Sequence, residues 1–100
     1  MEARVTSFDV QDMEGAIKDL ELAMDPIEEL PGNRGALALT NSRRARALAL
    51  SFWDSPQALK DSDLRSSELR EAVVSDGFCT IRGVETYHVA LSMRRPPRVR

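Results

Sequence analysis

The spacing of apolar residues in the first third of the chain restricts its fold more than any other feature. Apolar side chains recur there at steps of three and four, at Met13, Ala16, Ile17, Leu20, Ala23, Met24 and Ile27. This period is typical of an amphipathic helix with one face against a core. The polar residues 9–12 can cap the helix. Pro26 is expected to kink it or to restart a short turn, and Pro31-Gly32 should end it.

Short segments with a strand pattern surround this helix. Residues 3–8 are rich in β-branched and aromatic side chains and predict a strand. Residues 35–41 and 46–53, joined by the polar segment 42–44, predict a β-hairpin, although their alanine and leucine content alone favours helix. Alternation along the second of these strands places Leu48, Leu50 and Phe52 on one face, and Ala47, Ala49, Ser51 and Trp53 on the other.

A second helical region follows the hairpin. Ser55 supplies a capping oxygen and Pro56 a favourable φ for the first helical position. The helix is expected to break near residues 61–63 and to continue with an apolar stripe at Leu64, Leu69, Ala72 and Val73. Asp76-Gly77 should end it. Residues 78–91 then predict a last strand, which is best defined at 84–91.

The order strand–helix–strand–strand–helix–strand predicts a single α+β domain with the ferredoxin-like β-α-β-β-α-β arrangement. In that arrangement an antiparallel sheet carries both helices on one face. Its other face would expose rows of apolar residues, so we expect a homodimer that packs two sheets face to face. The domain is assigned to residues 1–93. Residues 94–100, which include four arginines, are expected to form a flexible basic tail.

Charge and residue counts exclude several classes of function. The net charge is −2, and the four arginines of the tail leave residues 1–93 at about −6, which argues against nucleic-acid binding. No apolar run approaches the roughly 20 residues that cross a bilayer, and no secretion signal is evident, so a cytoplasmic protein is expected. A single cysteine and a single histidine disfavour a disulfide or a multi-ligand metal site. Neither metal nor cofactor is expected.

Several local stretches together resemble a known family. They are residues 3–8 before the first helix, the segment Pro-Gly-Asn-Arg-Gly-Ala at 31–36, and residues 46–59, where a strand ends in tryptophan and leads into a capped helix. With the last strand they resemble, across residues 3–91, the antibiotic biosynthesis monooxygenase-like proteins of the dimeric α/β-barrel superfamily. The resemblance implies homodimers with one pocket per subunit, between the sheet and its helices. Proteins of this family include cofactor-free oxygenases that act on polycyclic aromatic polyketides, and relatives on the same fold include polyketide cyclases and haem-degrading enzymes. The resemblance implies an activity of one of these kinds.

Four residues are candidates for a site in such a pocket. Trp53 could stack on a planar substrate, and Ser51 and Asn41 could offer it hydrogen bonds. His88 is the natural general base, because histidine ionises near neutral pH. The alternative for Trp53 is packing in the core. The alternative for His88 is a position on the surface or in the dimer interface. The sequence leaves open which face of each strand lines the pocket. Further polar candidates are Thr6 and Ser7.

The sequence therefore predicts a cofactor-independent monooxygenase-like protein that acts on an aromatic or polyketide-type small molecule. One alternative is a non-catalytic dimeric module that binds a hydrophobic small ligand or serves as a scaffold. A polyketide cyclase on the same fold is the other. A histidine in the pocket would favour either enzyme over the non-catalytic module.

Overall fold

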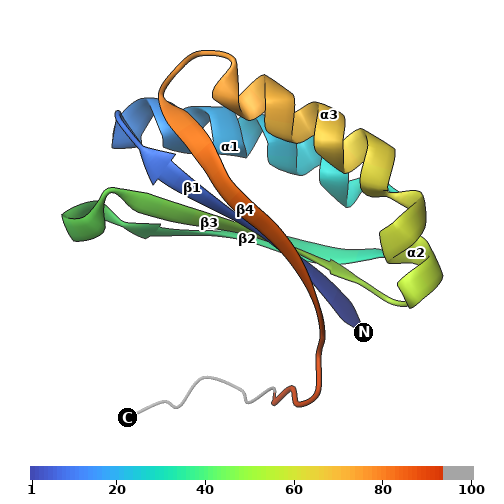
Figure 1. Cartoon of the computed structure of the whole chain (residues 1–100). Helices are drawn as coiled ribbons and strands as arrows, with labels where there is room; N and C mark the ends of the chain where they lie inside the picture. The colour runs from blue at the N-terminus through green and yellow to red at the C-terminus, as the bar shows by residue number, and fades with distance from the viewer. Residues whose placement is uncertain (94–100) are drawn as a thin grey trace, which may run out of the picture.

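A computed structural model describes residues 1–93 as a four-stranded sheet with helices on one side (Figure 1). The tail predicted at 94–100 lies outside the described residues. The elements, in chain order, are β1 (Glu2–Val10), α1 (Met13–Glu28), β2 (Asn33–Asn41), a 3-10 turn (Ser42–Arg44), β3 (Arg46–Trp53), α2 (Pro56–Asp61), α3 (Asp63–Val74) and β4 (Cys79–His88). The predicted ferredoxin-like α+β fold is confirmed. No helix within residues 1–93 has the length and apolar character that crossing a membrane requires.

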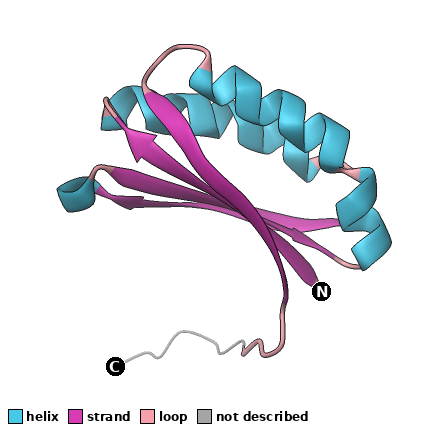
Figure 2. Cartoon of the chain, in the orientation of Figure 1, coloured by secondary structure: helices cyan, strands magenta, loops and turns pink. Residues whose placement is uncertain are grey.

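The sheet is antiparallel throughout, with the strand order β2-β3-β1-β4. Val5 of β1 lies opposite Leu50 of β3 on one side and Glu85 of β4 on the other. Leu50 in turn pairs with Leu37 of β2. All the α-helices cover the same face of this sheet, as Figure 2 shows, and no helix of the described residues covers the other. The side chains that point towards the helices therefore come from alternate residues of each strand.

The core lies where α1 and α3 cross the sheet. It is built from buried side chains of both helices and of three strands, namely Phe8, Val10, Ala16, Leu20, Ala47, Val73 and Cys79. Burial raises the pKa of the Cys79 thiol, and the nearby charge of Asp19 raises it further. Cys79 is therefore a neutral, small packing residue at physiological pH.

The ends of α1 and β4 differ from the sequence-based expectation. Helix α1 runs through Pro26 to Glu28, because Pro26 lies in its last turn and removes only the hydrogen bond to the carbonyl of Leu22. Strand β4 ends at His88 instead of continuing to residue 91. Its partner β1 begins at Glu2, and beyond His88 the two segments are joined by a backbone bond from the Val89 N–H to the Met1 carbonyl, at 2.9 Å.

The hairpin of β2 and β3 forms despite its alanines and leucines because both strands pair along their whole length. Its turn is a single 3-10 turn that Asn41 caps, its Oδ1 accepting a hydrogen bond from the Arg44 N–H at 3.2 Å. Ala45 closes the turn in the left-handed region, with φ of 52°. Pairing and burial of the strands outweigh local helix propensity here.

Gly32 fixes the opposite end of the hairpin, where β3 leads into α2. Its φ of 79° is left-handed, and a Cβ at this position would lie 2.5 Å from the Cβ of Ala58 in α2. Its carbonyl accepts a hydrogen bond from the Asp54 N–H at 2.9 Å. The turn before β2 therefore sets where α2 begins, next to Trp53 and the polar end of the pocket described below.

Candidate functional site

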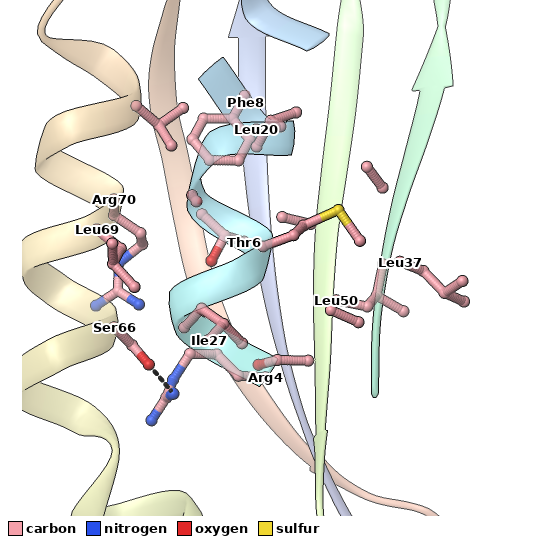
Figure 3. A pocket seen from close by; sticks show the side chains of 17 residues that line it. Arg4, Thr6, Phe8, Leu20, Ile27, Leu37, Leu50, Ser66, Leu69 and Arg70 are labelled. Carbon is pink, nitrogen blue, oxygen red and sulfur yellow. Dashed lines mark hydrogen bonds between the residues drawn. The ribbon is translucent and has the colours of Figure 1, made fainter. Parts of the chain in front are cut away.

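A pocket lies between the sheet and the helices α1 and α3 (Figure 3). It has a volume of about 550 Å³, which includes open solvent at its mouth. Its lining combines strand residues and helix residues: Arg4, Thr6, Phe8, Leu20, Ala23, Met24, Ile27, Ala36, Leu37, Ala38, Ala49, Leu50, Ser51, Ser66, Leu69, Arg70 and Val73. The space enclosed by the protein is smaller than this figure, because the figure counts solvent outside the walls.

Small side chains on β2 and β3 create this space. Ala36 pairs with Ser51 and Ala38 with Ala49, and all four are on the strand parity that faces the helices. They leave room that larger side chains would fill. The alanines that made the hairpin look helical in sequence therefore form the floor of the pocket. The opposite walls are apolar and come from α1 and α3, with Met24, Ile27 and Leu69 among them.

A buried arginine defines the polar end of the pocket. Arg4 is 4% exposed and donates hydrogen bonds to Ser62 Oγ at 2.9 Å, to Ser66 Oγ at 2.7 Å and to the Leu59 carbonyl at 3.0 Å. It also forms an ion pair with Asp63. Burial lowers the pKa of Arg4, while the Asp63 carboxylate opposes this effect. The guanidinium nevertheless keeps its charge at neutral pH, and it holds the α2–α3 corner against β1.

Trp53 lies beside this arginine. Its side chain is fully buried, its Nε1–H donates to Ser51 Oγ at 3.0 Å, and the Arg4 Cζ atom lies 6.0 Å from its ring centroid. Trp53 does not line the pocket, whereas Ser51 does. Of the residues proposed from sequence, the structure thus brings Ser51 and Trp53 together, with the serine at the pocket surface and the indole behind it.

The other two sequence candidates lie elsewhere. His88 is exposed at the end of β4, and its Nδ1 lies 3.0 Å from a carboxylate oxygen of Glu2. Asn41 is exposed at the turn of the β2–β3 hairpin, at the opposite end of these strands from Trp53. Neither residue lines the pocket of its own chain. The catalytic role of His88 and the binding role of Asn41 stay predictions.

Sequence reasoning missed three polar groups of the pocket: Arg4, Ser66 and Arg70. Arg70 is half-buried, and within residues 1–93 no carboxylate pairs with it. It lies one helical turn after Ser66, so the i, i+4 spacing was a usable signal once α3 was known to face the sheet. For Arg4 the signal was its strand parity, shared with Thr6 and Phe8. Thr6, a further sequence candidate, does line the pocket.

Metal binding has no ready site in the described part of the chain. No three histidine, cysteine, aspartate or glutamate side chains within residues 1–93 are grouped as metal ligands would be. The pocket's ionisable lining consists of Arg4 and Arg70.

The fold and the pocket define a class: a small ferredoxin-like domain with an apolar cavity between its sheet and its helices. Solved structures with this fold are similar to the chain, among them structures described as antibiotic biosynthesis monooxygenases, so the resemblance seen in the sequence is confirmed at the level of the fold. Neither protein-family profiles nor curated protein sequences give a match.

Three of these structures illustrate the likeness. SnoaB, a cofactor-independent oxygenase from Streptomyces nogalater, has a TM-score of 0.75 at 11% identity, covering 94% of this chain and 97% of that one. A monooxygenase from the gene ActVA-Orf6 of Streptomyces coelicolor, in complex with nanaomycin D, has a TM-score of 0.65 at 25% identity, covering 97% and 92%. A candidate antibiotic biosynthesis monooxygenase from Deinococcus radiodurans has a TM-score of 0.70 at 14% identity, covering 97% and 100%.

Proposed function

We propose that this protein binds a planar aromatic small molecule in its pocket and oxidises it with molecular oxygen, without a cofactor. The observation that carries the proposal is the pocket itself, which has a floor of small side chains, apolar walls and a polar end built around Arg4 and Arg70. A flat ring can lie on the alanine floor of β2 and β3, while its oxygen substituents reach the donors at the polar end. The fold it shares with a cofactor-independent oxygenase supports the same reaction class.

An anthrone offers a direct test of this reaction. Oxidation of 1,8-dihydroxyanthrone by O₂ converts its methylene carbon to a carbonyl, with one oxygen atom entering the product and the other leaving as water. We expect the protein, with a metal chelator present, to accelerate formation of the anthraquinone with one O₂ consumed per product. An oxygen electrode and the product absorbance measure the two quantities together. Product formation no faster than in buffer would contradict the proposal.

A pocket-filling variant makes the test specific. Ala49→Leu adds bulk to the pocket floor and should abolish both ligand binding and oxidation. A thermal unfolding curve first establishes that the variant has the native fold. Ala72→Leu is the matched control, because Ala72 is exposed on α3 and outside the pocket lining. Undiminished oxidation by a folded Ala49→Leu variant would place the reaction elsewhere on the molecule.

A non-catalytic binding module is the second candidate, and one observation favours it. Within residues 1–93 the pocket lining contains no histidine, aspartate, glutamate, lysine or tyrosine that could act as a general base. A protein of this kind would bind the anthrone without raising oxygen consumption. The cyclase alternative called for a histidine in the pocket, and His88 does not line it in its own chain.

We also propose that the protein is a homodimer formed through the uncovered face of its sheet. Leu37 and Leu39 are 51% and 48% exposed on this face. Strand pairing adds neighbours of the same parity, namely Val5, Leu48, Leu50 and Phe52. A two-fold axis brings such a patch onto itself, which buries the leucines of both copies. Arg46 of β3 and Glu85 of the edge strand β4 lie on the same face and offer opposite charges for pairing between copies.

A further inference from the structure

Two serines at the polar end of the pocket have protons to donate. Ser51 Oγ accepts a hydrogen bond from Trp53 Nε1–H at 3.0 Å, and Ser66 Oγ accepts one from Arg4 Nη1 at 2.7 Å. Both serines are buried, and neither hydroxyl donates to an acceptor within residues 1–93. A hydroxyl has a single proton. Each serine can therefore direct that proton towards a group held inside the pocket.

The two hydroxyls belong to the same end of the pocket because Arg4 connects them. Its guanidinium bonds to Ser66 and lies 6.0 Å from the ring of Trp53, which in turn bonds to Ser51. Figure 3 shows the Arg4–Ser66 contact between β1 and α3. The hydrogen bond from a charged guanidinium polarises the Ser66 hydroxyl and makes it a stronger donor.

This end of the pocket also has an excess of positive charge. Arg70 lines the pocket one turn after Ser66, and its charge lowers the pKa of Arg4, as two neighbouring cations require. The negative charge near these two guanidinium groups is that of Asp63, which pairs with Arg4. The Asp63 side chain is 66% exposed. Water screens that carboxylate more effectively than it screens the buried Arg4.

We propose that Ser51 and Ser66 make the pocket selective for the ionised form of its ligand, a phenolate or enolate whose oxygen lies between the two hydroxyls and Arg70. A phenolate oxygen accepts several hydrogen bonds, whereas a neutral phenol must also donate one, and the side chains of the described lining offer only hydroxyl oxygens to receive it, which accept more weakly than a carboxylate or an imidazole. The phenol proton passes to solvent as the anion binds. This inference rests on the proposed function in one respect, namely that the ligand is aromatic. It also explains how the ligand hydroxyl can ionise although the pocket lining within residues 1–93 provides no general base.

The ionisation of a bound chromophore tests this selectivity. The probe is 4-nitro-1-naphthol, whose neutral and anionic forms absorb at different wavelengths, titrated with pH alone and with saturating protein. We expect the pKa of the bound probe to lie about 1–2 units below that of the free probe, as for a group beside an opposite charge. This measurement uses the unaltered protein, so it does not depend on the folding of any variant.

Variants then assign the shift to the serines. Ser66→Ala and Ser51→Ala should each weaken binding of the anion roughly 3- to 10-fold, about the net effect of one ordinary hydrogen bond. Binding of the uncharged analogue 1-nitronaphthalene should stay unchanged, as followed by the fluorescence of Trp53, the one tryptophan of the chain. Ser67→Ala is the matched control, since Ser67 is exposed on the same helix.

The outcomes separate this inference from the proposed function. A bound probe whose pKa is unchanged or raised would overturn the selectivity and leave the pocket as a binding site for aromatic molecules. Equal losses for the naphtholate and the uncharged analogue in both serine variants would also overturn it, since they would indicate a role in shape alone. If neither probe binds the unaltered protein, the proposed function fails together with the inference.

Discussion

At the scale of single residues, Asp19 of α1 is the carboxylate in the least favourable position. Its Oδ2 atom is buried and has no hydrogen-bond partner within residues 1–93. Burial raises its pKa above the ordinary value of 3.8, and the neighbouring Asp76 raises it further, both as an acceptor for the proton of the neutral form and through its negative charge. Between the ordinary and the raised pKa the folded state binds more protons than the unfolded state, so the free energy of unfolding falls as pH rises through that window.

Asp19→Asn should therefore stabilise the protein at neutral pH and flatten this dependence. The amide has the same shape, carries no charge and can donate a hydrogen bond to Asp76. Urea unfolding between pH 4 and pH 7 measures the effect, with Asp25→Asn, exposed on the same helix, as the control. A stability–pH profile parallel to that of the unaltered protein would show that the two aspartates do not share a proton.

His88→Gln separates the two roles open to the histidine. The His88 side chain, which pairs with Glu2, is 70% exposed. Exposed ion pairs contribute about 1 kcal/mol or less to the free energy of unfolding. We expect nearly unchanged thermal stability and unchanged affinity for the naphthol probe. A fall of about 10²–10⁴ in anthrone oxidation with binding retained would support the predicted general-base role. An unchanged rate would contradict it.

At the scale of secondary-structure elements, the turn before β2 controls how α2 is placed. Gly32→Ala combines a left-handed φ with a Cβ that would meet Ala58 of α2 at 2.5 Å. We expect a loss of about 1–3 kcal/mol in the free energy of unfolding. Gly83→Ala is the control, because nothing lies within 4 Å of a Cβ there. Equal unfolding midpoints for the two variants in urea would contradict this account of the turn.

The elements were predictable from sequence where the signal is local, and the pocket was not. The 3–4 spacing of α1, the Ser55-Pro56 start of α2 and the hairpin pattern depend on neighbouring residues, and all appear in the structure. Arg4 and Ser66, in contrast, are 62 residues apart in sequence and meet only after β1 and α3 pack together. The alanines of β2 and β3 show the same limit, since their role as a pocket floor depends on which face the helices cover.

At the scale of the whole molecule, the apolar face of the sheet decides the oligomeric state. Leu37→Glu places a carboxylate within the proposed interface, where pairing two copies would bury two like charges. We expect sedimentation of the unaltered protein at micromolar concentration to give the mass of two chains of 11.2 kDa, and of the variant to give one. The Leu37 side chain is already half exposed in the single chain, so its replacement should leave the monomer folded.

Leu22→Glu provides the matched control for this last prediction. Leu22 is 75% exposed on α1, in the helical layer on the opposite side of the sheet, so the same change of chemistry there should leave a sheet-to-sheet dimer intact. Dissociation by Leu37→Glu and not by Leu22→Glu locates the interface on the sheet. Dissociation by Leu22→Glu alone would place it on the helices, and a monomer in the unaltered protein would remove the dimer altogether. Leu39 lies on the same face of the sheet as Leu37 and outside the pocket lining, so a folded Leu39→Glu monomer should still bind the naphthol probe, which makes ligand binding and assembly separable properties of this fold.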